Sequence, residues 1–116
     1  MKMKVEAAKE IDDGRHDGKI IDIEYRENPY QYTEIVIEET SRGMKLKAGY
    51  PTYLSPVSKL GKMMLRFGVN LQIGQEIDPD VLVGKECSFV VVNKTTQTGT
   101  FPTIVVESLV PKENNQ

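Results

Sequence analysis

The sequence predicts one small all-β domain of five strands, with a single helix between the third and fourth strands. Three observations predict it: short segments of alternating apolar and polar side chains, turn residues between them, and one helix-period segment with capping residues. The chain has 116 residues, 39% hydrophobic and 28% charged, enough for a core without disulfides. We expect a single domain over 1–116, with a lead-in at 1–13 and a short polar tail at 111–116.

Three strands are expected before the helix. Asp and Gly residues at 12–18 are typical of turns, and residues 19–26 then alternate, with Ile21, Ile23 and Tyr25 on one side. Residues 32–39 form the second expected strand, with Thr33, Ile35 and Ile37 on one side. Residues 44–50 form the third, with Met44, Leu46, Ala48 and Tyr50 on one face. In the third strand Lys45 and Lys47 share the face opposite the apolar side chains.

The helix is expected after residue 55. Ser55 is a good N-cap, Pro56 suits the first helical position, and Gly68 offers a left-handed C-terminal cap. The apolar stripe of this helix consists of Val57, Leu60, Met64 and Phe67. Two β-branched strands follow, at 87–92 and 103–106, joined by a polar loop at 93–99.

Three strands, a helix and two strands is the element order of the OB-fold, a five-stranded Greek-key barrel. That fold binds oligonucleotides or oligosaccharides on its second and third strands and on the loops after strands one and four. Lysines that neutralise phosphates and rings that stack on bases are the side chains expected there. The candidate single-stranded DNA-binding residues are Arg26, Tyr30, Tyr32, Arg42, Lys45, Lys47, Tyr50, Tyr53 and Lys94.

Each tyrosine has a second interpretation. Tyr25 and Phe89 follow the alternation of core residues, and Phe67 lies on the apolar stripe of the helix. Tyr50 also follows the alternation, but it ends its strand, so both interpretations stay open. The other candidate tyrosines are equally compatible with ordinary surface positions. Glu34 and Glu38 share a face with Tyr32 and would repel phosphate, so the groove is expected to favour the third strand and the loops.

Charge is distributed in blocks. Residues 1–42 carry a net charge of −4, residues 43–75 carry +5 without one acid, and residues 76–116 carry −3. The basic block is the expected electrostatic footprint for a polyanion, or else a solvated helix face.

Catalysis, metals and cofactors are not expected. The only histidine, His16, lies among turn residues, and the only cysteine, Cys87, lies in an apolar strand. A Cys/His zinc site is therefore excluded, and no phosphate loop or nucleophile elbow is present. With no apolar span and no signal peptide, we expect a cytoplasmic protein that does not contact membranes.

Five short segments carry a resemblance: Gly18-Lys19-Ile20, Gly49-Tyr50-Pro51-Thr52, Ser58-Lys59-Leu60-Gly61, Arg66-Phe67-Gly68 and Leu82-Val83-Gly84-Lys85. With them, residues 14–110 resemble the small single-stranded DNA-binding proteins of bacteriophages, closest to the type of lactococcal phages. The resemblance implies an OB-fold that coats DNA single strands in phage replication or recombination in the host cytoplasm, often as an oligomer. The chain departs from many bacterial single-strand binders, since it ends in 112–116 without a long acidic tail.

The sequence leaves two main hypotheses. The first is a protein that binds single-stranded DNA without strong sequence preference and self-associates to multiply its contacts. The second is a protein-interaction module on the same barrel, which recruits a replication or recombination partner through the acidic side chains Glu24, Glu34 and Glu38. An oligosaccharide binder has less support, because the chain has no Trp.

Overall fold

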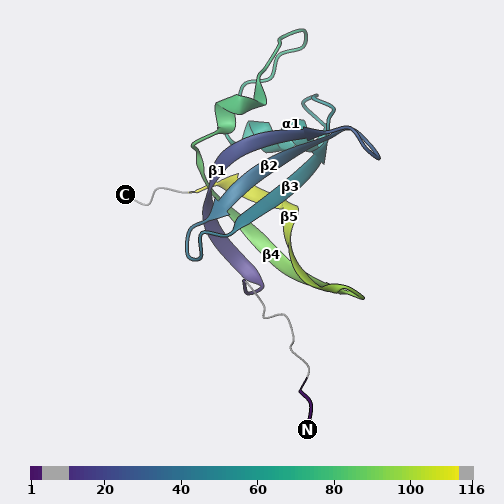
Figure 1. Ribbon diagram of the computed structural model, residues 1–116. Helices are drawn as coiled ribbons and strands as arrows, with labels where there is room; N and C mark the ends of the chain where they lie inside the picture. The colour runs from purple at the N-terminus through teal and green to yellow at the C-terminus, as the bar shows by residue number, and fades with distance from the viewer. Residues whose placement is uncertain (4–10, 113–116) are drawn as a thin grey trace.

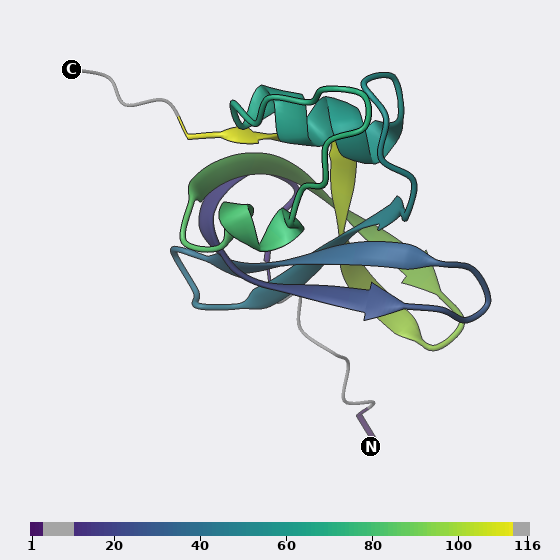
Figure 2. The same ribbon diagram turned by 90° about the horizontal axis from the view of Figure 1, so that it is seen from above.

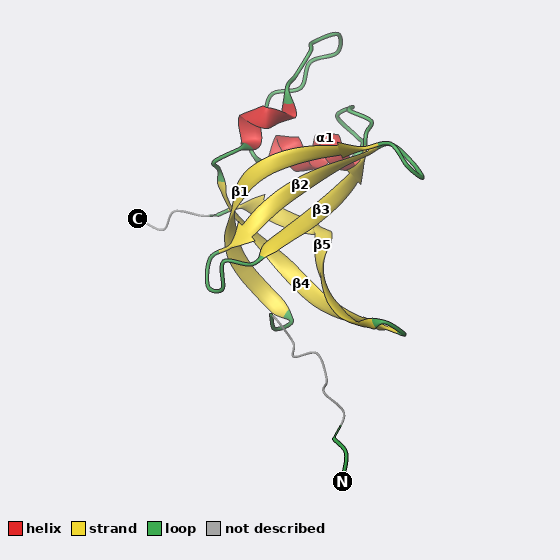
Figure 3. Cartoon of the chain, viewed as in Figure 1, coloured by secondary structure: helices red, strands yellow, loops and turns green. Residues whose placement is uncertain are grey.

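The described residues, 1–3 and 11–112 of a computed structural model, form one antiparallel sheet with a single α-helix after the third strand. The strand order is β3-β2-β1-β4-β5, and the first two views show how the sheet curls while α1 lies along one side (Figures 1 and 2). The elements are β1 (Gly14–Arg26), β2 (Tyr32–Glu39), β3 (Lys45–Pro51), α1 (Lys59–Arg66), the 3₁₀ helix η1 (Pro79–Leu82), β4 (Glu86–Thr96) and β5 (Gly99–Pro111) (Figure 3). The expected mostly-β architecture and helix position are confirmed.

The sheet is not closed by a hydrogen-bonded ladder, but its two edge strands, β3 and β5, lie against each other. The contact depends on an irregularity in β5. Val105 pairs with Val90 and Val110 pairs with Ser88, so β5 has extra residues between these pairs. The Ser108 hydroxyl accepts from the backbone N–H of Val90 (2.8 Å) and so replaces one missing ladder bond.

The carbonyls of this β5 bulge, residues 106–109, are bonded by side chains from two other elements. The Tyr50 phenol of β3 donates to the Val106 carbonyl (2.7 Å). The Arg66 guanidinium of α1 donates to the Leu109 carbonyl (2.9 Å) and, over a longer distance, to the Val106 carbonyl (3.4 Å). Buried carbonyls need such partners, and these ones tie β3, α1 and β5 together at one point.

The first strand begins at Gly14, five residues before the predicted start, so the turn predicted at 12–18 is wrong for most of its length. Residues 14–19 pair with β4, and residues 18–26 pair with β2. Gly18 stands where one pairing gives way to the other. A Cβ there would lie 2.7 Å from both the Glu38 carbonyl oxygen and the Ile37 Cγ2, so glycine serves the close approach of strands rather than a turn.

The helix begins later than predicted. Ser58 is the N-cap, and its hydroxyl accepts from the Gly61 N–H (3.0 Å), while residues 55–58 form a separate turn. Gly61 packs so closely on this turn that a Cβ would lie 1.7 Å from the Ser55 carbonyl oxygen. Val57 is therefore exposed and not part of the stripe, whereas Leu60, Met64 and Phe67 are buried as predicted.

The core lies between the inner faces of the curled sheet and α1. The residues predicted on the inner faces of β2 and β3 are buried, as are Phe89 and Phe67, except that Met44 precedes β3 and is partly buried. Cys87 is fully buried, and burial raises the pKa of its thiol to about 12. Tyr25 is 59% exposed, so its prediction as a core residue is wrong. Tyr25 keeps the phase of the buried Ile23, but it is the penultimate residue of β1, near Asp80 and Asp78 and away from the core.

The predicted polar loop at 93–99 is mostly strand. β4 and β5 pair from Asn93↔Pro102 to Thr96↔Gly99, leaving only a tight turn at the tip. The resulting two-stranded ribbon projects from the body of the sheet on the same side as the loop between β1 and β2 (Figures 1 and 2).

We expect Tyr50→Phe to lower the free energy of unfolding by about 1 kcal/mol, because the Val106 carbonyl loses its short hydrogen bond while the core keeps its volume. Urea unfolding followed by circular dichroism measures the change. Tyr30→Phe, at a tyrosine that is 70% exposed, is the matched control and should leave stability unchanged. Equal stability of Tyr50→Phe and the wild type would contradict the role given to this bond.

Candidate nucleic-acid interface

The outward face of β1, β2 and β3 is electrically balanced. Strand register places four basic and four acidic side chains on it: Lys19, Arg26, Lys45 and Lys47 with Asp22, Glu24, Glu34 and Glu38. Two of the predicted cations are paired there. Lys47 contacts Glu24 at 2.8 Å and Arg26 contacts Glu34 at 3.7 Å. The hydrogen bond and charge of Glu24 raise the pKa of Lys47.

The middle of this face therefore has no excess of positive charge that would attract phosphate. Lys45 also lies directly across from Glu38 in the β2–β3 register. Acidic side chains therefore balance the lysines of β3 as well as the outward face of β2, because β3 pairs with β2 along its whole length.

Four predicted residues gather at one end of this face, which we call the tyrosine end: Arg26, Tyr30, Tyr32 and Tyr53. Arg26 pairs with Tyr32 across β1 and β2, and Tyr32 pairs with Pro51 across β2 and β3. The pairing continues beyond the strands, because the Thr52 N–H donates to the Gln31 carbonyl (3.0 Å). Tyr30 and Tyr53 are the next residues outward on the two segments.

The rings of the tyrosine end differ in their freedom. The Arg26 guanidinium carbon lies 5.5 Å from the centroid of the Tyr32 ring, and the same ring packs beside Gly49. Tyr30 and Tyr53 are 70% and 67% exposed. One half-buried ring held by a cation, flanked by two open rings, is an arrangement that can stack on unpaired bases.

The remaining predicted residues do not join this end. Arg42 and Lys45 lie at the β2–β3 turn, and Lys45 is about 20 Å along the sheet from Tyr32 by strand rise. Lys94 lies on the β4–β5 ribbon, where it pairs with the half-exposed Phe101. Phe101 is a ring that the sequence did not indicate, because it lies between the predicted loop at 93–99 and the predicted strand at 103–106, whereas β5 begins at Gly99. Tyr50 is 1% exposed and belongs to the core, which removes it from the candidates.

The β2–β3 turn is fixed by a buried carboxylate, that of Glu39. It accepts from the Ser41 N–H (2.8 Å), the Ser41 hydroxyl (2.6 Å) and the Arg42 N–H (3.0 Å). His16 Nδ1 lies 3.7 Å away. Burial alone would raise the pKa of Glu39, but the Ser41 and Arg42 hydrogen bonds and the nearby His16 outweigh it and lower the pKa below its ordinary value of 4.5.

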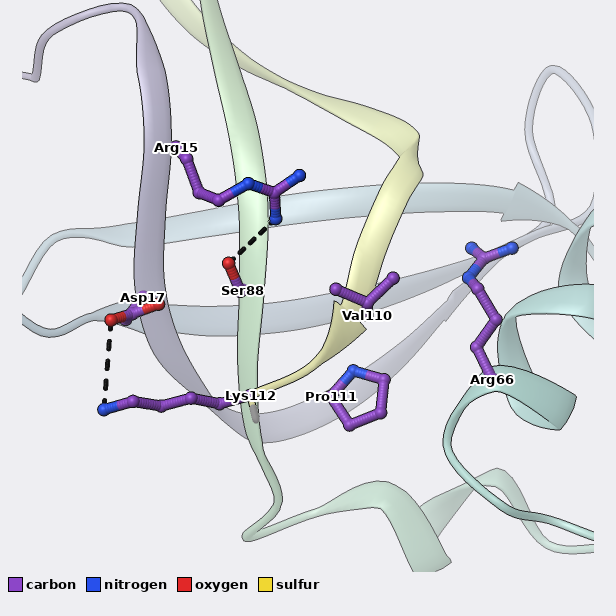
Figure 4. Close-up of a pocket in the computed structure, with 7 residues that line it drawn as sticks. All are labelled: Arg15, Asp17, Arg66, Ser88, Val110, Pro111 and Lys112. Carbon is purple, nitrogen blue, oxygen red and sulfur yellow. Dashed lines mark hydrogen bonds and ion pairs between the residues drawn. The ribbon is translucent and has the colours of Figure 1, made fainter. Parts of the chain in front are cut away.

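A hollow of about 760 Å³ on the outward side of β1, β4 and β5 is lined by basic side chains that are not among the predicted DNA-binding residues, although Arg66 belongs to the basic block at 43–75. Arg15 and Asp17 of β1 face Ser88 of β4 there, and Arg66 and Lys112 complete the rim (Figure 4). These cations come from parts of the sequence far apart, including two blocks that are acidic on average.

No protein-family model matches the chain, and no curated protein matches it significantly. Within the described residues, no helix has the length and hydrophobicity to cross a membrane. The same part of the chain brings no three His, Cys, Asp or Glu side chains together as metal ligands.

We expect Glu39→Gln to destabilise the protein by about 1 kcal/mol at neutral pH, because an amide oxygen accepts the turn's N–H bonds more weakly than a carboxylate. A lowered folded-state pKa stabilises the fold above the unfolded pKa, and that contribution is lost as pH falls through the folded value. The gap between the wild type and the variant should therefore close below about pH 4. Urea unfolding at pH 7 and pH 3 measures it, and a gap that stays constant would contradict the assignment.

Proposed function

We propose that the protein binds single-stranded DNA without strong sequence preference and catalyses no reaction. The observation that carries the proposal is the tyrosine end, where two paired segments carry Tyr30, Tyr32 and Tyr53, and Arg26 lies over the Tyr32 ring. Stacking on rings tolerates any base, because every base has a π-face.

The sheet supports an OB-type barrel as the finer description of the fold. Strand order β3-β2-β1-β4-β5, a helix after β3 and a contact between β3 and β5 are the features such a barrel combines. In that fold the loop after β1 and the β4–β5 connection flank the oligonucleotide. Here these two segments project on the same side of the molecule and carry Tyr30, Lys94 and Phe101 (Figure 1).

A single domain with one ring cluster makes few contacts to a strand. We therefore propose that several copies bind side by side, so that neighbouring copies multiply the contacts along one DNA strand. A role in phage replication or recombination is part of the same proposal and follows from the resemblance of residues 14–110.

The balanced outer face favours a second function, a protein-interaction module. Ion pairs such as Lys47–Glu24 suit a surface that meets another protein rather than phosphate. A partner captured from the host by the tagged protein, retained after nuclease treatment and lost in the double variant Glu34→Lys/Glu38→Lys, would support it.

We expect the double variant Tyr30→Ala/Tyr53→Ala to bind oligothymidylate roughly thirtyfold more weakly, since each lost stacking contact costs about 1 kcal/mol. Fluorescence anisotropy with a labelled oligonucleotide measures this at several salt concentrations. Tyr25→Ala is the matched control. Tyr25 is also largely exposed, but its surroundings are acidic. Partial burial of its phenol and the charges of the nearby Asp80 and Asp78 raise the pKa of Tyr25.

Two results would overturn the proposal: no binding by the wild type at low salt, or equal binding to single-stranded and duplex DNA. Thermal unfolding of each variant separates a lost contact from a lost fold. The same titration with oligouridylate decides between DNA and RNA preference.

A further inference from the structure

Three neighbouring hollows form one continuous surface, which we call the cationic track. The hollow of about 760 Å³ shares Pro111 and Lys112 with a second hollow of about 460 Å³, and it shares Arg66 with a third of about 220 Å³. The basic side chains along the track are Lys19, Lys85, Lys112, Arg15, Arg66, Lys62 and Lys59.

The track has a strong excess of positive charge. Seven cations line it against three carboxylates, those of Asp17, Glu86 and Glu107. The chain as a whole has a net charge of −2, so this concentration is opposite in sign to the average. Local potentials of this kind attract polyanions even to a mildly acidic protein.

Most of these cations have no carboxylate partner. Arg15 donates to the neutral Ser88 hydroxyl (2.9 Å), and Arg66 donates to backbone carbonyls. Among the described residues, Lys62 and Lys85 also lie outside ion-pair distance of any acid. Lys19 makes no ion pair either, but it stands where the track meets the balanced face, across from Glu38 and Glu86 in the strand register. The two ion pairs on the track, Lys112–Asp17 at 3.8 Å and Lys59–Glu107 at 3.9 Å, are long and solvated.

One end of the track lies near the tyrosine end. Tyr50 lines the third hollow together with Lys59 and Lys62, and Tyr53 follows it by three residues. A strand stacked on Tyr53 can therefore continue past α1 toward Arg66 and Lys112. The balanced face of β1, β2 and β3 offers no comparable route, because its cations are matched by acids.

We propose that the cationic track holds the sugar-phosphate backbone of a second stretch of the strand that leaves the tyrosine end, so that longer single strands wrap around the domain. This inference rests on the proposed function. A backbone needs only a row of cations that releases counterions. An acidic protein segment would also need accessible apolar anchor sites. Of the apolar side chains that line the track, Phe67 and Tyr50 are buried in the core, which leaves only Val106, Val110 and Pro111 accessible.

The test compares a short and a long oligothymidylate, a hexamer and a strand of about 20 nucleotides, which bracket the usual 4–16 nucleotides per OB domain. The track variant is Lys62→Gln/Lys85→Gln/Lys112→Gln, three exposed lysines. The matched control is Lys2→Gln/Arg42→Gln/Lys45→Gln, which changes the net charge equally at three exposed residues outside the track and away from the tyrosine end.

We expect the track variant to bind the long strand about tenfold more weakly than the wild type does. The slope of log K against log salt should fall by about 2, since each lost phosphate contact contributes about 0.7 for single strands. Binding of the hexamer should stay within about twofold, and the control should keep the wild-type slope.

Two results would overturn the proposed role of the track alone, provided that the wild type binds both strands. One is an equal loss of long-strand affinity in the two triple variants, and the other is an unchanged salt slope in the track variant. Failure of the wild type to bind either strand would instead overturn the proposed function. A third outcome is that a polyglutamate peptide binds the wild type but not the track variant and displaces the long strand. That result would overturn the proposal and assign the track to an acidic protein segment.

Discussion

The arrangement of the molecule depends on the carbonyls of the β5 bulge and the side chains that bond them. Because Tyr50 comes from β3 and Arg66 from α1, the two bonds bring the free edge of the sheet and the helix onto one stretch of β5. The same contacts set the surfaces on either side. The segment beyond Tyr50 leads to the tyrosine end, and the helix that carries Arg66 presents its lysines beside the bulge.

The basic residues are grouped differently on the folded surface than they are along the sequence. The basic block at 43–75 looks like one surface in the sequence, but folding divides it. Its strand lysines meet the acids of β1 and β2, whereas its helix cations join Arg15 and Lys112 from blocks that are acidic on average. Antiparallel pairing produces this exchange, since it places residues far apart in sequence on one face.

Local pattern was sufficient for much of the fold. Alternation identified the inner residues of β2 and β3, such as Ile35 and Leu46, because one face of each strand is buried. Non-local contacts defeated it elsewhere. Gly18 carries the signature of a turn, yet its lack of a Cβ serves a strand crossing, and Ser55 and Ser58 are both plausible caps until packing against Gly61 selects one. Tyr30 and Tyr32 were predicted because they lie at the loop after the first strand, and Tyr53 because it lies just beyond the third strand. The cations of the track could not be found in this way, because the β1–β4 pairing brings several of them together.

The single cysteine has a practical consequence. Cys87 is sealed inside the core with its thiol held in the protonated, unreactive form at neutral pH. A second cysteine introduced at an exposed position such as Gln97, at the tip of the ribbon, would be the one that reacts with a maleimide dye. The native sequence can therefore serve directly as the background for site-specific fluorophores, without first removing a competing thiol.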